Sequence, residues 1–361
     1  MTPVATNLNN PRGIDFLPDG RMVVLEAGTG TTLQIETTGT GRISIFEDVN
    51  GDGDYDDAGE RTPILDGVPS YNSLRFLNTG HDEVYGLGDL VTLPDGSIYF
   101  TKDDPFAEPA PQFDDLFYGD TGIFSVNAAS GEAQRLVKRA ATVSAIAYHP
   151  EREGFYATES GLNAMMFTDL AGEVTELVTF AELASGQQAV PAGIAYDPTT
   201  GDLLVALFSG FIKDYYGTML SFMPGDAKIV RYDPDTEMVT DEITGLTTAI
   251  DVAVDDSGNV YVAELTTEWA PALMPAAFDL YDPASPPDVG GYERFSGRIT
   301  AYPAGGGEPM LLADGVETPT NMTWHAGALY ISTGLGTPGR SVHTAGGLHA
   351  ITGVIYRMNG I

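Results

Sequence analysis

The chain contains no cysteine, only four lysines, and no apolar run long enough to span a bilayer. Without cysteine, disulfide bonds, thiolate nucleophiles and cysteine-ligated zinc sites are excluded. The 17 basic residues are outnumbered by 51 acidic ones, which gives a formal charge of −34 over 361 residues. Nucleic acids and anionic membrane surfaces are bound through clustered basic groups, so the composition argues against both as partners.

The acidic excess has two interpretations. It suits salt-rich or calcium-rich surroundings outside the cytoplasm, where counterions screen self-repulsion, and it equally suits simple colloidal solubility. The first interpretation leads us to expect an extracytoplasmic (secreted or periplasmic) protein. No signal peptide is visible, so we expect its signal segment to have been removed. The sequence also lacks a Gly-x-Ser-x-Gly elbow, a Walker loop and a His-Glu-x-x-His motif. It does not indicate the oligomeric state.

What the chain does contain is a repeated phrase. An apolar strand, a Pro-Asp-Gly or Asp-Ser-Gly turn and a second apolar strand occupy residues 11–26 and return at 88–102. Weaker copies follow at 145–159, 193–207, 251–264 and 321–333. Each copy is a hairpin signal, and six copies in one chain predict an all-β, six-bladed β-propeller.

Each blade is expected to have four strands, A to D, counted from the axis outward. The sixth blade is one strand short, because the chain ends soon after the expected strand at 353–358. The N-terminal segment 3–8 has strand character, and we expect it to supply the missing outer strand and close the ring. No linker or change in composition divides the chain, so residues 1–361 are expected to form one domain.

The connections from strand B to strand C lie on one face of such a propeller, the top face. Four of these connections are unusually long: 103–121, 208–227, 266–296 and 334–352. Long loops in a compact domain are usually functional or disordered, and disordered segments are poor in aromatic residues. These loops contain many, including Phe117, Trp269 and Tyr292. We therefore expect an ordered canopy that binds a small molecule; the alternative is that the loops only shield the channel or form a subunit contact.

Polar residues fall at the strand ends that meet near the axis on the top face. Crowded carboxylates need a cation or shared protons, and hard oxygen ligands suit Ca²⁺ or Mg²⁺. We therefore expect a divalent-metal site in the channel. Its ligands are expected among Glu26, Asp89, Glu159, Asp251, Glu264 and Asn321. The alternative is that the strand-end glutamates face solvent or pair with Arg12 and Lys102.

Two histidines and one lysine are the candidates for acid–base catalysis. His81 lies in the long top connection between the first two blades, and His343 lies in the last B-to-C loop. Lys102 ends a strand B and is expected near the same mouth of the channel. For either histidine the alternative is an ordinary surface or packed side chain. Two further histidines fall in bottom turns and are expected to be structural: His149 and His325.

The sharpest local motif is the acidic segment 48–60. It places Asp, Asn and Asp at alternating positions before a glycine, as calcium-binding loops do. The segment joins strands C and D of the first blade, on the bottom face, and predicts a structural Ca²⁺ site. The expected ligands are Asp48, Asn50, Asp52, Asp54, Asp56 and Glu60. The alternative is a solvated acidic turn.

Three phrases carry a family resemblance: PRGIDFLPDGRMVVLEAGTG at 11–30, GLGDL at 86–90 and VIYRM at 354–358. They resemble NHL-like six-bladed propellers of the ScyD/ScyE type. The wider group includes metal-dependent lactonases and esterases of the gluconolactonase and paraoxonase kind, whose channel ligands are Glu, Asn and Asp on inner strands. Residues of similar type and depth in this chain are Glu26, Asp89, Asp251 and Asn321.

Two functions follow as hypotheses. The first is a secreted hydrolase or lactonase, in which a divalent ion polarises a carbonyl or phosphoryl oxygen and the canopy holds an apolar or aromatic substrate. The second is a non-catalytic propeller that uses the same face to bind a ligand or a protein.

Overall fold

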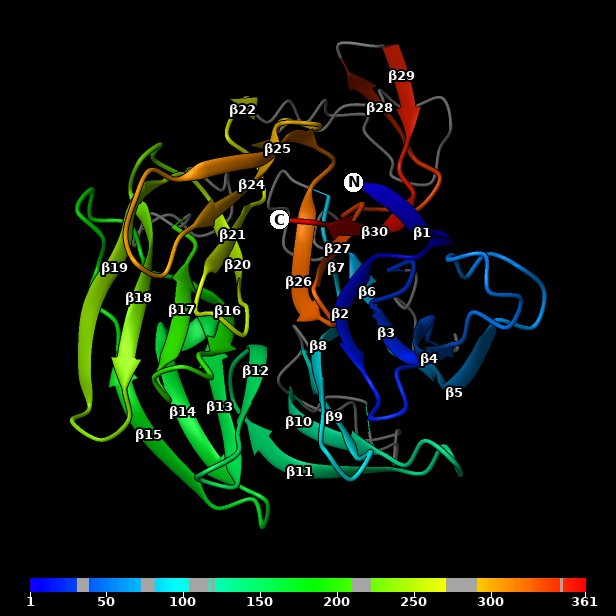
Figure 1. The fold of residues 1–361 in the computed structure, drawn as a ribbon, viewed down its shortest axis with the longest axis horizontal. Helices are drawn as coiled ribbons and strands as arrows, with labels where there is room; N and C mark the ends of the chain where they lie inside the picture. The colour runs from blue at the N-terminus through cyan, green and yellow to red at the C-terminus, as the bar shows by residue number, and fades with distance from the viewer. Residues whose placement is uncertain are drawn as a thin grey trace.

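The computed structural model describes residues 1–30, 39–72, 82–103, 117, 121–209, 222–270, 291–344 and 347–361. Six four-stranded antiparallel sheets surround a central axis (Figure 1), which confirms the predicted six-bladed all-β propeller. Within the described ranges the only helix is a single 3₁₀ turn, Ser160–Leu162. This part of the chain therefore has no helix that is long and apolar enough to cross a membrane.

The blades follow one another along the chain, each with its first strand at the axis. The first has β2 (Pro11–Phe16), β3 (Met22–Glu26), β4 (Gly41–Phe46) and β5 (Arg61–Val68). The second has β8 (Leu87–Thr92), β9 (Ile98–Lys102), β10 (Thr121–Val126) and β11 (Ala133–Arg139). The third has β12 (Val143–His149), β13 (Gly154–Glu159), β14 (Ala164–Asp169) and β15 (Val174–Thr179).

The remaining blades repeat this order. The fourth has β16 (Pro191–Tyr196), β17 (Leu203–Leu207), β18 (Ala227–Asp233) and β19 (Met238–Leu246). The fifth has β20 (Ala249–Val254), β21 (Val260–Glu264), β24 (Gly297–Tyr302) and β25 (Met310–Val316). The sixth has β26 (Pro319–His325), β27 (Ala328–Thr333), β30 (Gly353–Asn359) and β1 (Thr2–Leu8). Three short hairpins complete the described strands: β6 (Tyr71–Asn72) with β7 (Val84–Tyr85), β22 (Trp269–Ala270) with β23 (Gly291–Tyr292), and β28 (Ser341–Thr344) with β29 (Gly347–Ala350).

The Pro-Asp-Gly phrases form the tight turns between the first two strands of a blade. In the first blade, the Gly20 N–H donates to the Leu17 carbonyl at 2.8 Å, and Gly20 has a φ of +88°. In the second blade, the Gly96 N–H donates to the Leu93 carbonyl at 2.8 Å with a φ of +86°. Glycine adopts positive φ without steric penalty, so the repeated phrase fixes the same hairpin in both blades.

The ring closes as expected, because the N-terminal strand β1 pairs antiparallel with β30. The acidic segment 48–60 lies against this closing strand. The Tyr55 N–H donates to the Val4 carbonyl at 2.7 Å, and the Thr6 N–H donates to Asp56 at 2.9 Å. Arg61 donates to the Thr6 carbonyl at 2.9 Å. The first blade therefore fastens the strand that completes the sixth.

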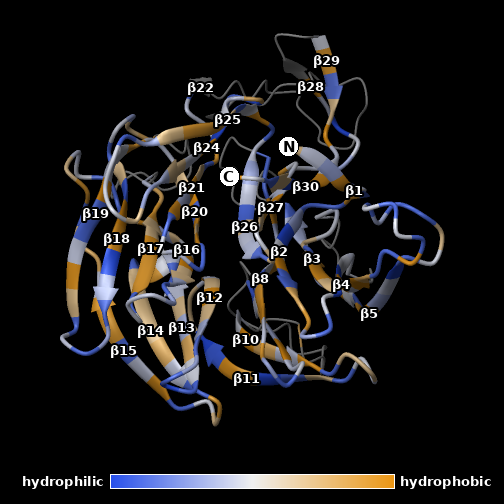
Figure 2. Ribbon diagram, viewed as in Figure 1, coloured by the Kyte–Doolittle hydropathy of each residue, from blue (hydrophilic) through white to orange (hydrophobic). Residues whose placement is uncertain are grey.

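The hydrophobic core is divided among the contacts between neighbouring blades. Six buried clusters each combine residues of two adjacent blades. Figure 2 shows apolar residues along the strands and hydrophilic residues at many of the turns. Because each blade buries its faces only against its neighbours, the axis itself is left to polar side chains and open space.

Candidate functional site

Two cavities share the central channel. The upper cavity has a volume of about 170 Å³ and is lined by the tops of the innermost strands and the loops above them. The lower cavity has a volume of about 200 Å³ and lies along the same strands. Asp89, Asp251 and Asn321 line both cavities, and we call these three residues the channel waist.

The waist residues occupy the same register position in three blades, as the repeat predicted. Each accepts a backbone N–H from the first strand of the next blade. Asp89 accepts from Ile146 at 3.0 Å, and Asp251 accepts from Met322 at 2.6 Å. Asn321 accepts from Ile14 at 3.1 Å, and its amide donates to Asp89 at 3.1 Å. These bonds join neighbouring blades as well as lining the channel.

Small residues at the equivalent position of other blades leave room for this arrangement. A Cβ atom on Gly193 would lie 2.0 Å from Oδ1 of Asp251, and one on Gly13 would lie 2.5 Å from the Leu90 nitrogen. Glycine is therefore required beside each aspartate because the neighbouring blade approaches too closely for any side chain.

One half-buried acid of the channel was not predicted from the sequence. Asp15 lines the lower cavity and accepts the backbone N–H of Thr92 at 2.6 Å and its hydroxyl at 3.0 Å. It stands two residues after Gly13 in the repeated phrase, and no other copy has an acid at that place. That departure from the repeat was the signal that could have identified it.

Burial dominates the protonation of these acids. It raises the pKa of Asp89 to about 7 and that of Asp15 to about 6, although backbone hydrogen bonds partly offset the effect. Burial and then the nearby Asp89 carboxylate raise the pKa of Asp251 well above its ordinary value. Both aspartates of the channel waist therefore hold a proton more readily than an ordinary aspartate does.

The glutamates at the ends of the second strands do not join the waist. Glu26 accepts the Asn9 N–H at 2.6 Å, and Glu264 accepts the Thr247 N–H at 2.8 Å. Glu159 is fully buried and forms an ion pair with Arg139 at 2.6 Å. None of the three lines either cavity. Strand B lies one strand away from the axis, so its terminal side chains bind connections and neighbouring blades instead.

Of the three candidate catalytic side chains, the structure describes only that of Lys102. Lys102 is fully buried, and its Nζ donates to the Asp103 carbonyl at 3.4 Å, but it lines neither cavity. His81 lies outside the described residues, and His343 belongs to β28 in the last top connection. The predicted structural role of His149 agrees with its buried position and its contact with the Gly201 carbonyl at 3.0 Å.

The expected aromatic canopy falls largely on residues outside the described ranges. Tyr292 is described; it lines the upper cavity and packs edge-on against Phe208 with ring centres 6.3 Å apart. Phe117 instead packs against Phe100 and Phe124 of the second blade. One canopy residue therefore reaches the cavity, and another belongs to the core.

In the acidic segment 48–60, carboxylates bind the loop's own backbone. Asp48 accepts the N–H groups of Gly51 at 2.6 Å and Gly53 at 2.9 Å. The buried Glu60 accepts the N–H groups of Val49 at 3.2 Å and Asp57 at 3.0 Å. The remaining candidate ligands bind one another or the closing strand: Asn50, Asp52, Asp54 and Asp56. The calcium site stays a prediction.

A divalent ion at the waist fits the donor set poorly. Both oxygens of Asp89 accept hydrogen bonds, and the Asn321 oxygen is engaged by Ile14. Across the ranges that the structure describes, no group of three or more Asp, Glu, His or Cys side chains is placed to hold a metal ion. The channel metal stays a prediction, and we assign no chemical step to it.

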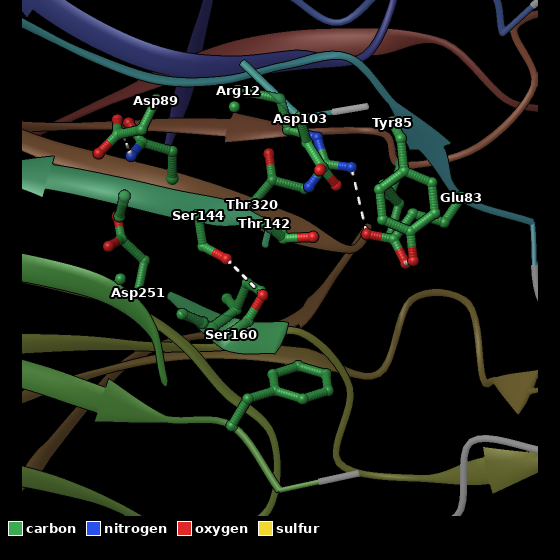
Figure 3. Close-up of a pocket in the computed structure, with 18 of the residues that line it drawn as sticks. Arg12, Glu83, Tyr85, Asp89, Asp103, Thr142, Ser144, Ser160, Asp251 and Thr320 are labelled. Atoms are coloured by element: carbon green, nitrogen blue, oxygen red, sulfur yellow. Dashed lines mark hydrogen bonds and ion pairs between the residues drawn. The ribbon is translucent and has the colours of Figure 1, made fainter. Parts of the chain in front are cut away.

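The upper cavity has two unlike walls and two polar ends (Figure 3). One wall is a buried apolar cluster that includes Ala192, Phe208, Leu265 and Leu335. Hydroxyl groups line the cavity between its ends: Thr142, Ser144, Ser160 and Thr320, with Ser144 donating to Ser160 at 2.9 Å. In Figure 3, Asp89 and Asp251 form one end, and Arg12, Glu83, Tyr85 and Asp103 form the other.

These features define the class of the protein: a six-bladed β-propeller with a ligand-sized, two-faced cavity on its axis. The family model described as SMP-30/gluconolactonase/LRE-like region matches residues 57–250. The chain therefore belongs to the SMP-30/gluconolactonase/LRE-like family, which agrees with the wider resemblance seen in the sequence. The narrower ScyD/ScyE type stays a prediction.

Solved structures support the fold. The chain is similar to one in a crystal structure of a nidogen/laminin complex, with 15% identity, coverage of 81% of this chain and 82% of that chain, and a TM-score of 0.50. It is also similar to a structural genomics protein of unknown function from Bacteroides thetaiotaomicron, with 11% identity, coverage of 98% and 70%, and a TM-score of 0.53. No curated protein matches the sequence. At these identities the likeness shows the fold alone.

Proposed function

We propose that the protein is a hydrolase or lactonase that acts on an apolar or aromatic small molecule in the upper cavity. The supporting observation is the pairing of an apolar wall with a row of hydroxyls that leads to two buried carboxyl groups. Membership of a family that includes gluconolactonases agrees with this reaction class. The fold by itself does not favour an enzyme over a binding protein.

In this proposal the apolar wall holds the body of the substrate, and its ester or lactone group lies toward the waist. Thr142 and Ser160 are the cavity-lining hydroxyl groups that would orient the carbonyl. The other two hydroxyl groups already donate, Ser144 to Ser160 and Thr320 to the Pro11 carbonyl. Asp89 and Asp251 are the acid–base candidates. The pKa of Asp89 is about 7, where a carboxyl can both deliver and accept a proton, and the raised pKa of Asp251 favours its protonated form. Water attacks the carbonyl carbon, the acyl–oxygen bond breaks, and the proton passes to the departing alkoxide.

The test is a panel of aromatic esters and lactones, assayed at pH 7 with and without EDTA. The informative variants are Asp89→Asn and Asp251→Asn. Asp15→Asn is the matched control, since Asp15 is also bonded between blades but lines only the lower cavity. We expect at least a tenfold loss of kcat/KM in the first two variants and little change in the control. Equal activity in all three variants would contradict the assignment to the upper cavity.

The response to EDTA decides the separate prediction of a channel metal, Ca²⁺ or Mg²⁺. Activity that is lost on chelation and restored by either ion would support it, and activity that persists would leave the carboxyl groups as the catalytic candidates.

The alternative function is a non-catalytic propeller that binds a ligand or a protein on its top face. One observation favours it: the Ser144 hydroxyl donates to Ser160, not to a histidine or carboxylate that could activate it as a nucleophile. A protein that hydrolyses nothing in the panel, yet gains thermal stability from apolar ligands, would be of this second kind.

A further inference from the structure

Arg12 gives the upper cavity a feature that hydrolysis does not require. Among the described residues that line this cavity, it is the one cationic side chain. It projects from β2, and its side chain is 15% exposed. Its Nη2 donates to the Val84 carbonyl at 3.0 Å and to a Glu83 carboxylate oxygen at 3.4 Å. Arg12 is thus anchored at one end of the cavity, opposite the channel waist (Figure 3).

The hydrogen-bonding capacity of this guanidinium is not exhausted. Its Nε–H is buried and has no hydrogen-bond partner within the described parts of the chain. The contact with Glu83 is a single bond at 3.4 Å, whereas strong pairs between arginine and a carboxylate are bidentate at about 2.7–2.9 Å. Tyr85 also donates to Glu83, at 3.4 Å. A second carboxylate of better geometry could therefore compete for Arg12.

We propose that the upper cavity binds an aromatic or alicyclic carboxylic acid, with its carboxylate on Arg12 and its ring against the apolar wall. The planar fork of a guanidinium recognises a carboxylate specifically. Phe208, which belongs to this apolar wall, and Tyr292, which packs against it, supply the aromatic surface. This inference rests on the proposed function in using the same cavity, and it deepens it by naming the substrate class. The Arg12 end, opposite the waist, would hold a carboxylate that the substrate carries in addition to its ester or lactone group.

Two acids at the same end of the cavity limit the affinity. Glu83 competes directly for Arg12, and Asp103 adds negative charge beside it. The recognition therefore depends on directed hydrogen bonds and not on a broadly positive field. Removing the Glu83 charge should free the guanidinium and strengthen the binding of an acid.

The test is calorimetric titration at pH 7.5 with phenylacetate and with phenylacetamide, a neutral molecule of nearly the same shape. We expect phenylacetate to bind at least tenfold more tightly. Arg12→Gln should abolish this preference, Arg12→Lys should retain part of it because the charge remains without the fork, and Glu83→Gln should raise the affinity for the acid severalfold. Arg21→Gln is the matched control, since Arg21 is an exposed arginine paired with Asp19.

Three results would overturn the inference: equal binding of acid and amide, no binding of the acid, or an unchanged preference in Arg12→Gln. If Arg12→Gln does not fold, Glu83→Gln is compared with Asp103→Asn, which removes the same charge at the same end of the cavity. Competition for Arg12 predicts a larger gain in affinity for the acid in Glu83→Gln, and equal gains would overturn the inference. The ester and lactone panel is scored separately. Hydrolysis of neutral esters without a preference for acids would preserve the proposed function and reject this inference. Binding of the acid without hydrolysis of any ester or lactone would support this inference and reject the proposed function.

Discussion

At the scale of single residues, the same register position of the channel waist is occupied by asparagine in one blade and by aspartate in two others. Asn321 binds the next blade and Asp89 without carrying a charge. Asp89 makes the same kind of bond to Ile146, but burial raises its pKa to about 7. An amide therefore makes these bonds without a buried charge. A buried aspartate makes them too, but its ionisation at higher pH destabilises the fold.

This contrast predicts that Asp89→Asn stabilises the fold at alkaline pH. A carboxyl whose pKa rises from 3.8 unfolded to about 7 folded has no penalty below pH 4 and loses stability as the pH rises toward 7. The full penalty is on the order of 4 kcal/mol, less about 1 kcal/mol for one hydrogen bond that the amide cannot accept. Urea unfolding should show the variant ahead by about 1–3 kcal/mol at pH 8 and not at pH 4.

The same variant separates protons from a metal at the waist. In saturating Ca²⁺ a metal-holding waist predicts the opposite sign, because the variant would lose a ligand and with it the stabilisation that the ion provides. A variant that is less stable than the wild type only when Ca²⁺ is present would support the channel metal.

Single residues were predicted unevenly from the sequence. The repeat register placed Asp89, Asp251 and Asn321 together, because equivalent positions of an innermost strand must meet at an axis. It misplaced Glu26 and Glu159, because the end of a second strand is near the top face without being near the axis. Arg12 entered only as an alternative ion-pair partner, since nothing in its local sequence indicates that it lines a cavity.

At the scale of elements, the closing strand β1 is held by its pairing with β30, by the buried side chains of Val4, Ala5 and Leu8, and by the loop that contains Tyr55. Deleting residues 1–9 should expose an open strand edge and lower the melting temperature sharply. Burying the two larger apolar side chains, Val4 and Leu8, contributes several kcal/mol by itself. Deleting only the exposed residues 1–3 is the control, and an equal melting temperature for both deletions would refute the closure.

The acidic segment 48–60 predicts a second effect at this scale. Added Ca²⁺ should raise the melting temperature, because a ligand that binds only the folded state stabilises it. Asp48→Ala with Asp52→Ala should remove part of that increase and leave hydrolysis largely intact, since the loop faces the bottom and contacts β1. Lost activity with an unchanged calcium response would count against the assignment.

Elements were predicted more reliably than residues. The strands expected at 353–358 and 3–8 are found as Gly353–Asn359 and Thr2–Leu8. Glycine turns and apolar alternation fix such strands locally. The packing of one blade on the next then follows from the repeat itself. The long top connections share no repeat with one another, so their sequences could indicate only that they are long and aromatic.

At the scale of the whole molecule, the formal charge of −34 should make stability depend on salt. Repulsion among like charges opposes the compact state and is screened within about 10 Å at 0.1 M salt. Adding NaCl at pH 8 should raise the melting temperature by several degrees before it levels off, and the increase should shrink at pH 4.5, where many carboxylates are protonated. An increase that is independent of pH would point to general salt effects and weaken our expectation of salt-rich, extracytoplasmic surroundings.

The pairing of β1 with β30 also sets an order in time. Thr2 lies opposite Arg357, so the first strand of the ring can find its partner only when β30 has been made. At about 5–20 residues per second, tens of seconds pass between the synthesis of the two strands. During that interval the growing arc of blades has two unpaired ends, while each new blade can already pack on the one before it. The ring is completed in a single late step, which joins its earliest strand to its latest.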